Sequence, residues 1–161
     1  MTGMAKQAAG STDFPRQINR LVGRVSPWWI YGLGLVPAAW YFYLGATDQL
    51  GANPIQTFEH LLGEWALRFM ILTLLVTPLR ELTRVNLYRF RRAFGLLTFY
   101  YVLFHFLTYM ILDRALNIPE IVVDISKRPY IIIGMTAFVG LILLAVTSNS
   151  WSVRRLARRW G

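Results

Sequence analysis

Four apolar blocks, each 18 to 20 residues long, leave few folds open to this chain. They cover residues 27–45, 60–79, 93–112 and 130–147. A helix of about 20 apolar residues spans the hydrocarbon core of a bilayer, where only helices or closed barrels satisfy the backbone. Charged residues make up 16% of the chain, against about 25% in soluble domains. The blocks therefore predict an all-α, polytopic membrane bundle of about four transmembrane helices, which follows a polar, basic tail over residues 1–26.

Lysine and arginine alternate between the connecting segments. Four lie in the N-terminal tail, five in the second loop and four in the C-terminal tail, whereas the first loop has none and the third has three. Because positive residues concentrate on the cytoplasmic side of a membrane, both ends of the chain are predicted to be cytoplasmic. The same pattern makes the net charge of +9 a topology signal beside membrane lipid, and it predicts no nucleic-acid partner.

The second loop, residues 80–92, holds five arginines and one glutamate. One interpretation is a topology signal that contacts anionic lipid. The other is a site for the phosphate of a flavin nucleotide, because the neighbouring guanidinium groups of Arg91 and Arg92 match phosphate oxygens in pairs. The residues alone leave both interpretations open.

The chain has no cysteine, which limits the cofactors that it can hold. This absence excludes disulfides, cysteine-ligated iron–sulfur clusters, zinc fingers and haem attached through thioethers. Any metal or cofactor must be held by histidine, by carboxylates or without a covalent bond.

Few ionisable side chains fall inside the blocks: Glu64, Arg68 and His105, with His60 at the outer end of the second block. Such groups cost roughly 2.5–3.5 kcal/mol each on membrane-insertion scales and normally face the interior of the bundle. Glu64 and Arg68 lie four residues apart, so the two side chains would pair along one face of a helix. That pairing does not explain why two charges lie in the membrane.

His105 and Arg68 are expected at a similar depth, about 10–12 Å below the outer surface, because the second helix starts there and the third ends there. A neutral imidazole at that depth suits an axial ligand of haem iron, and an arginine beside it would pair with a haem propionate. The alternative is a core histidine hydrogen-bonded to Tyr101, Thr108 or Tyr109. Spacing leaves both open.

Several segments, in the same order, resemble the MsrQ (YedZ) family over about residues 30–160. The matching segments are NP at 53–54, HLLGEWAL at 60–67, LLVTPLR at 74–80, RRAFGL at 91–96, LFH at 103–105, RPYI at 128–131 and LAVTS at 144–148. The family belongs to the ferric-reductase-like transmembrane class. The resemblance implies a haem b-containing subunit of the bacterial inner membrane, and it also implies bound FMN. Electrons would pass from the quinone pool or a flavin to a periplasmic molybdopterin reductase of the MsrP type, which repairs methionine sulfoxide in oxidised proteins.

The resemblance also assigns the site residues. His105 matches the family's haem ligand, His60 is a candidate second ligand, and no residue of this chain is expected to reduce a sulfoxide itself. The family continues past residue 160 into segments that supply further haem ligands, whereas this sequence ends at residue 161. We therefore expect a truncated, incomplete ferric-reductase-like domain over residues 27–161. His60 and His105 would differ by about 10 Å in depth, so the two alone are expected to hold haem weakly.

A different functional class stays open. The chain would then be a non-redox membrane protein, such as half of a small transporter or an assembly factor, with Glu64 and Arg68 in a structural role. Colour separates the two classes, because a haem protein purified from membranes shows a Soret band.

Overall fold

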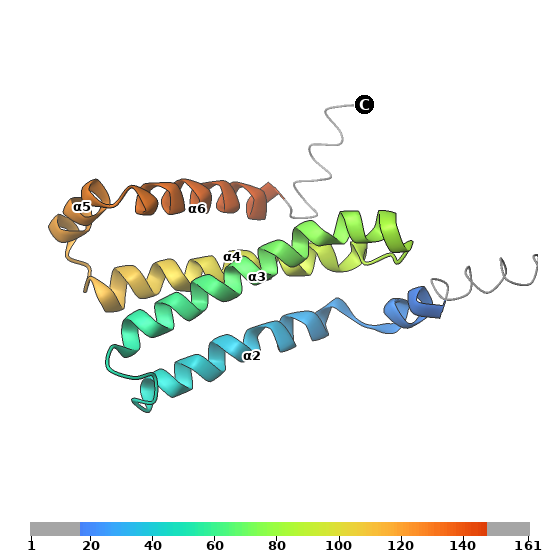
Figure 1. Ribbon diagram of the computed structural model, residues 1–161, viewed down its shortest axis with the longest axis horizontal. Helices are drawn as coiled ribbons and strands as arrows, with labels where there is room; N and C mark the ends of the chain where they lie inside the picture. Colours follow the sequence, from blue (N-terminus) through green and yellow to red (C-terminus); the bar gives the residue numbers. More distant parts are fainter. Residues whose placement is uncertain (1–16, 148–161) are drawn as a thin grey trace, which may run out of the picture.

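The computed structural model describes residues 17–147, and this part of the chain is built from helices alone (Figure 1). Residues 17–24 form a first short helix. The other elements are α2 (Pro27–Ala46), α3 (Pro54–Thr83), α4 (Tyr88–Leu107), the π-helical turn η1 (Thr108–Asp113), α5 (Ile118–Lys127) and α6 (Pro129–Thr147). No strand forms between residues 17 and 147, so the all-α prediction is confirmed.

Proline marks the start of three long helices. Pro27, Pro54 and Pro129 each occupy the first turn of α2, α3 or α6, where the missing N–H is not needed. The hydroxyl of Ser26 caps α2 by accepting the N–H of Trp28 at 3.4 Å. The helix α3 starts six residues before the predicted block and runs through Pro78 to Thr83, so it exceeds the prediction at both ends.

Three helices of the described chain are long and apolar enough to cross a membrane. They are α3, the continuous rod of α4 and η1, and α6, with mean hydropathies of 1.4, 1.6 and 2.4. The fourth predicted span, α2, has 20 residues and no charged side chain, but its Trp, Tyr, Gly and Pro content lowers its hydropathy. The structure therefore confirms an all-α membrane bundle with three clear spans.

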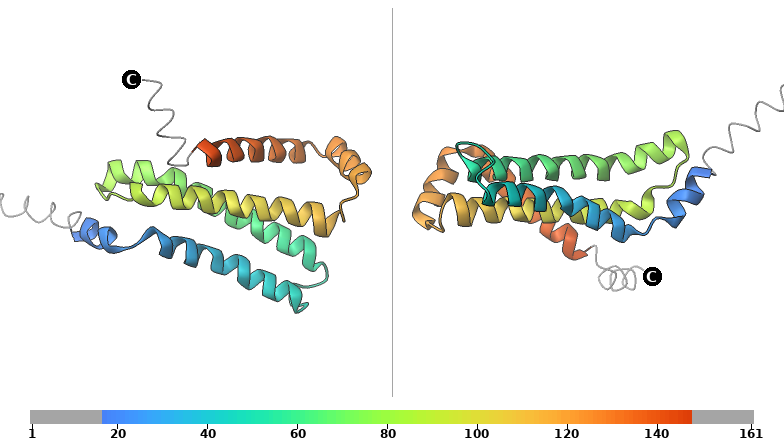
Figure 2. Two further views of the ribbon diagram at one scale, coloured as in Figure 1. Left: turned by 180° about the vertical axis from the view of Figure 1, so that it is seen from behind. Right: turned by 90° about the horizontal axis from the view of Figure 1, so that it is seen from below.

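The helix α4 lies at the centre of the bundle and contacts α2, α3 and α6. In Figures 1 and 2 the pair of α3 and α4 forms the middle layer, with α2 on one side and α6 on the other. The short helix α5 joins α4 to α6 at the end of the bundle where α2 also turns into α3. The first helix and the α3–α4 loop lie at the opposite end.

The packed core lies where α3 and α4 meet α2. Its buried members are Leu62, Ala66, Phe69, Leu97 and Tyr101. By contrast, α6 buries no residue, and most of its apolar side chains are exposed. In a bilayer such a surface contacts lipid or further helices, so the apolar exterior agrees with a membrane location.

The hydroxyl of Tyr101 joins α4 to α2 beside Pro37. It donates to the carbonyl oxygen of Gly34 at 2.7 Å and accepts the N–H of Ala38 at 3.1 Å. These two groups would form a rung of the hydrogen-bond ladder in a regular helix. The tyrosine is therefore inserted into α2 at the turn that a proline has already weakened.

The α2–α4 contact is close at Gly34. A Cβ atom placed on this glycine would lie only 2.4 Å from Cδ1 of Leu97, whose side chain is fully buried. A glycine at this position lets the two backbones approach, as small residues commonly do between membrane helices.

The first helix is attached to the α3–α4 loop. Asn19 accepts the N–H of Asn86 at 2.7 Å and donates to the carbonyl of Arg84 at 3.2 Å. Arg89 donates to the carbonyls of Val22 and Gly23 at 3.3 and 2.7 Å. The end of the predicted polar tail thus forms an ordered contact with the basic loop, whereas residues 1–16 lie outside the described range.

The rod of α4 ends in the π-helical turn η1. Beyond it, the N–H of Arg114 bonds to the carbonyl of Tyr109 at 3.0 Å, five residues back. A π-helical turn is wider than an α-helical one and is frequent at functional sites. Here the turn brings Tyr109, Asp113 and Arg114 to the wall of one cavity.

Candidate functional site

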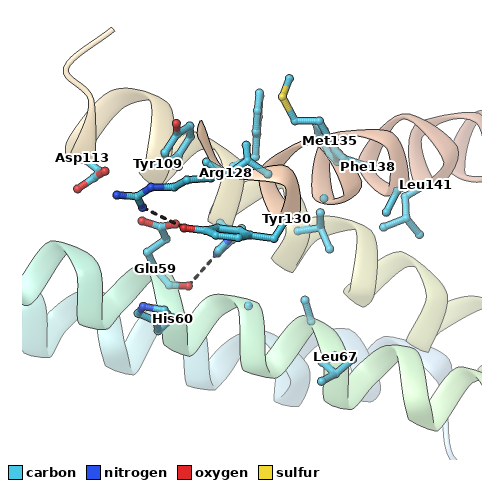
Figure 3. Close-up of a pocket in the computed structure, with 18 of the residues that line it drawn as sticks. Glu59, His60, Leu67, Tyr109, Asp113, Arg128, Tyr130, Met135, Phe138 and Leu141 are labelled. Atoms are coloured by element: carbon cyan, nitrogen blue, oxygen red, sulfur yellow. Dashed lines mark hydrogen bonds and ion pairs between the residues drawn. The ribbon is translucent and has the colours of Figure 1, made fainter. Parts of the chain in front are cut away.

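A cavity of about 690 Å³ lies between α3, the α4–η1 rod and the start of α6. Ligand pockets of proteins typically measure about 300–1,000 Å³. One face of α3 supplies a wall through residues that recur every three or four positions, singly or as adjacent pairs, as the helical repeat requires: Gln56, Glu59, His60, Gly63, Ala66, Leu67 and Met70. Figure 3 shows polar side chains around Glu59 and Tyr109 at one end of the cavity and apolar ones around Leu67 and Leu141 at the other.

His105 projects from α4 into this cavity and is held by α3. Its Nδ1 lies 2.9 Å from the backbone oxygen of Glu59. Because a carbonyl oxygen only accepts, Nδ1 carries a proton, and in the neutral ring the lone pair is on Nε2. Metal-ligating histidines are commonly oriented in this way. The carboxylate of Glu59 lies 3.8 Å from Nε2, so the partner of His105 is Glu59 rather than one of the three residues considered from the sequence.

Gly63 makes room for the imidazole. A Cβ atom at this position would lie 3.4 Å from Nδ1 and 3.5 Å from Cε1 of His105. A methyl group would therefore just fit, whereas a longer side chain would displace the ring from the helix. The contact identifies Gly63 as a residue that sequence reasoning missed.

His60 lines the same cavity as His105, and the predicted difference of about 10 Å in depth is wrong. The reason is the early start of α3 at Pro54, which places His60 six residues, or about 9 Å, inside the helix instead of at its end. His105 contacts Glu59 and Gly63, the residues on either side of His60. The structure therefore brings the two predicted haem ligands to one level and one cavity.

Arg68 is not brought to His105. Its Nη2 lies 2.9 Å from Oε2 of Glu64, and both side chains are more than half exposed. Its guanidinium also lies 4.9 Å from the ring centroid of Trp65, a distance at which a cation attracts an aromatic face. Since Trp65 contacts Tyr101, one turn inward from His105, the expected shared layer of Arg68 and His105 is wrong. The cavity wall does not include Arg68.

Arg91 and Arg92 lie at the start of α4, 14 and 13 residues before His105, which corresponds to about 20 Å along the helix. Both are exposed. Arg91 contacts Tyr88, with Nη1 at 3.5 Å from its hydroxyl, and Arg80 approaches the same ring. The two predicted phosphate-binding residues therefore belong to the basic loop at the opposite end of the bundle from the cavity.

The polar end of the cavity contains two arginines that sequence reasoning counted only as topology signals. Arg114 and Arg128 both line the cavity, and the carboxylate of Asp124 joins them. Its Oδ2 lies 2.8 Å from Nη2 of Arg114, and its Oδ1 lies 2.9 Å from Nε of Arg128. Tyr109 donates to the same carboxylate at 3.0 Å, and Arg128 donates to the hydroxyl of Tyr130 at 3.0 Å.

Both arginines carry a firm positive charge. Desolvation acts to lower the pKa of Arg114, but the carboxylates of Asp124 and Asp113 outweigh it and raise that pKa above its ordinary value. The hydrogen bond to Tyr130 and the charge of Asp124 raise the pKa of Arg128. A pattern of arginines flanking the short third loop was visible in the sequence, but only the fold places them at one cavity.

The residues of the cavity fit a flat macrocycle with acidic substituents. One or two imidazoles can ligate its metal, apolar and aromatic side chains can cover its faces, and guanidinium groups can meet its carboxylates. Between residues 17 and 147, no cluster of three or more His, Asp or Glu could hold a bare metal ion.

A family model described as ferric reductase like transmembrane component matches residues 62–161. Similar proteins of Brucella ovis, Brucella suis and Brucella abortus are each named protein-methionine-sulfoxide reductase heme-binding subunit MsrQ. Each is 62% identical to this chain over 138 residues, which is 86% of this chain and 63% of the relative. The chain thus spans less than two thirds of the length of these relatives. No solved structure matches.

Proposed function

This chain belongs to the ferric-reductase-like transmembrane component family, and from that premise we propose that it is a haem b-binding subunit that carries electrons across the bacterial inner membrane. One observation carries the proposal. His105, on a membrane-spanning helix, lines a cavity of about 690 Å³; its Nδ1 lies 2.9 Å from the backbone oxygen of Glu59, and its Nε2 lies 3.8 Å from the Glu59 carboxylate.

The residues of the cavity have distinct roles in this proposal. His105 would ligate the haem iron, and the backbone carbonyl of Glu59, 2.9 Å from Nδ1, would orient its ring. His60, which lines the same cavity from α3, is the candidate second ligand. Phe106 and Phe138, whose ring centroids lie 5.0 Å apart, help to exclude water from the apolar part. A bound haem would supply a one-electron carrier that cycles between ferric and ferrous iron.

The proposal extends to partners by similarity to relatives named as methionine-sulfoxide reductase subunits. Electrons enter from the quinone pool or a flavin and leave to a periplasmic molybdopterin reductase of the MsrP type, which repairs oxidised proteins. Arg91 and Arg92 are the candidate residues for an FMN phosphate. In this proposal both termini are cytoplasmic and the α5 end of the bundle is periplasmic, which the charge bias of the loops supports.

The test is spectroscopic. Wild type purified from membranes should show a Soret band. His105→Ala should lose this band, whereas His60→Ala should keep more of its intensity than His105→Ala does. Reduction of the purified protein by a quinol tests the quinone pool as the donor. Release of FMN on denaturation tests the flavin as the donor. Equal haem loading in wild type and His105→Ala would refute the assignment of the ligand, and colourless wild type would favour the non-redox alternative.

Topology has its own test. A reporter that is active only in the periplasm should give signal when fused near residues 50 and 120, and none near residue 86. A signal at residue 86 would overturn the proposed orientation.

A further inference from the structure

We infer that Arg114 and Arg128, held in place by Asp124, are the residues that bind the carboxylates of the cavity's cofactor. The inference rests on the proposed function, because it concerns the haem that His105 would ligate. It replaces Arg68, which the sequence had suggested for this role, with two residues that line the cavity.

Both guanidinium groups belong to the cavity that His105 lines. They come from the two ends of the segment that joins η1 to α6, so one short connection supplies both. In Figure 3, Arg128 lies with Tyr130, Tyr109 and Asp113 at the polar end, away from Leu67 and Leu141. A haem has its two carboxylates on one edge, and this cavity has its two arginines at one end.

Each arginine keeps a donor for an incoming carboxylate. Arg114 donates through Nη2 to Asp124, whereas its buried Nε lies 3.1 Å from Oδ2 of Asp113 without making a hydrogen bond among residues 17–147. Arg128 pairs through Nε with Asp124 and donates through Nη1 to Tyr130, and its Nη2 makes no hydrogen bond with residues 17–147. Charge-assisted bonds from guanidinium to carboxylate are among the strongest that side chains make.

Asp124 has the burial expected of a positioning residue. It is 9% exposed and accepts from Tyr109, Arg114 and Arg128 together. A carboxylate shared by two guanidinium groups restricts their rotamers, so little side-chain entropy is lost when they meet a ligand. The carboxylates of Asp113 and Asp124 also balance both positive charges while the donors stay available.

Arg68 differs from this pair in its position. It does not line the cavity, and its one carboxylate partner, Glu64, lies four residues away on the same helix. It therefore provides a matched control, since it is an arginine of the same chain with one ion pair and no expected contact with the cofactor.

The test compares haem with its dimethyl ester, which keeps the ring and the iron but has no charged carboxylates. Each ligand is titrated into the detergent-solubilised 161-residue chain, and binding is followed by the Soret band. Wild type should bind haem about 10- to 100-fold more tightly than the diester, as expected for charge-assisted hydrogen bonds. In Arg128→Gln and Arg114→Gln this preference should shrink by about tenfold, with affinity for the diester unchanged. Arg128→Lys should retain part of the preference, and Arg68→Gln should retain all of it.

The outcomes separate the inference from the proposed function. If wild type binds neither ligand, the proposed function fails and this inference fails with it. If wild type binds both equally, or if Arg128→Gln keeps the full preference, the inference alone is wrong. If the arginine variants lose haem and diester to the same extent, their role is only structural. A preference lost in Arg68→Gln would return the role to Arg68.

Discussion

Replacing Tyr101 by phenylalanine removes a single hydroxyl from the contact between α4 and α2. That hydroxyl makes two hydrogen bonds, at 2.7 Å to the carbonyl of Gly34 and at 3.1 Å from the N–H of Ala38, and the residue is 0% exposed. The aromatic ring stays, so its contacts with Phe69 and Trp65 should persist. The variant therefore tests the hydrogen bonds and not the packing.

The expected cost follows from these two bonds. Interhelical hydrogen bonds in membranes average about 0.6 kcal/mol, and buried ones in soluble proteins contribute about 0.5–1.5 kcal/mol. Two bonds then give about 1–3 kcal/mol. The lower end applies if α2 straightens and Ala38 bonds directly to Gly34 after the hydroxyl is gone.

The free energy of unfolding can be measured by titrating the protein in mixed micelles with sodium dodecyl sulfate and following its helicity. Tyr100→Phe is the matched control, because Tyr100 is exposed and its hydroxyl makes no hydrogen bond with residues 17–147. If Tyr101→Phe costs no more than this control, the inserted hydroxyl contributes nothing.

The connection with Pro37 has a separate test. In a Pro37→Ala background the helix regains an N–H and can close its ladder, so Tyr101→Phe should cost about 1 kcal/mol less than in wild type. An identical cost in both backgrounds would contradict the explanation that Tyr101 compensates for the proline.

Three further results are expected. Gly34→Ala should destabilise the bundle by about 1–3 kcal/mol through overpacking against buried Leu97, measured in the same unfolding assay, and a neutral result would contradict the close α2–α4 approach. Gly63→Leu should displace His105 and remove the Soret band while Gly63→Ala keeps it, and equal spectra would show that this glycine is not needed for space. Asn19→Ala should increase hydrogen exchange at the amide of residue 86 without changing exchange in α3, and unchanged protection would contradict an ordered contact between the first helix and the loop.

The sequence could predict the helices because their signals are local. Apolar runs of membrane length determine α3, α4 and α6 almost without reference to the rest of the chain, and prolines mark the starts of α3 and α6. Charge alternation likewise needs no tertiary information. The early start of α3 was missed because residues 54–59 include Gln56 and Glu59, polar side chains that a hydropathy pattern assigns to a loop.

The site was less accessible because it depends on how helices face one another. His105 was found from its depth in one block, but its partner Glu59 lies 46 residues away and belongs to a helix of unknown rotation at that stage. Arg68 was chosen for its depth, although the rotation of α3 directs it away from the cavity. Arg114 and Arg128 were overlooked because a loop residue gives no sign of the cavity beneath it.

At the turn η1, the number of residues affects the direction of Arg114 more than the identity of those residues does. A π-helical turn contains about one residue more than an α-helical turn, and each residue of an α-helix rotates the chain by about 100°. Deleting one residue between positions 108 and 113 would let α4 continue as a regular helix and would turn Arg114 from the cavity toward a different neighbour. Two homologues with identical histidines but a one-residue difference here would therefore present different charges to the same cavity. An alignment gap at this turn is consequently a functional difference, even where every named site residue is matched.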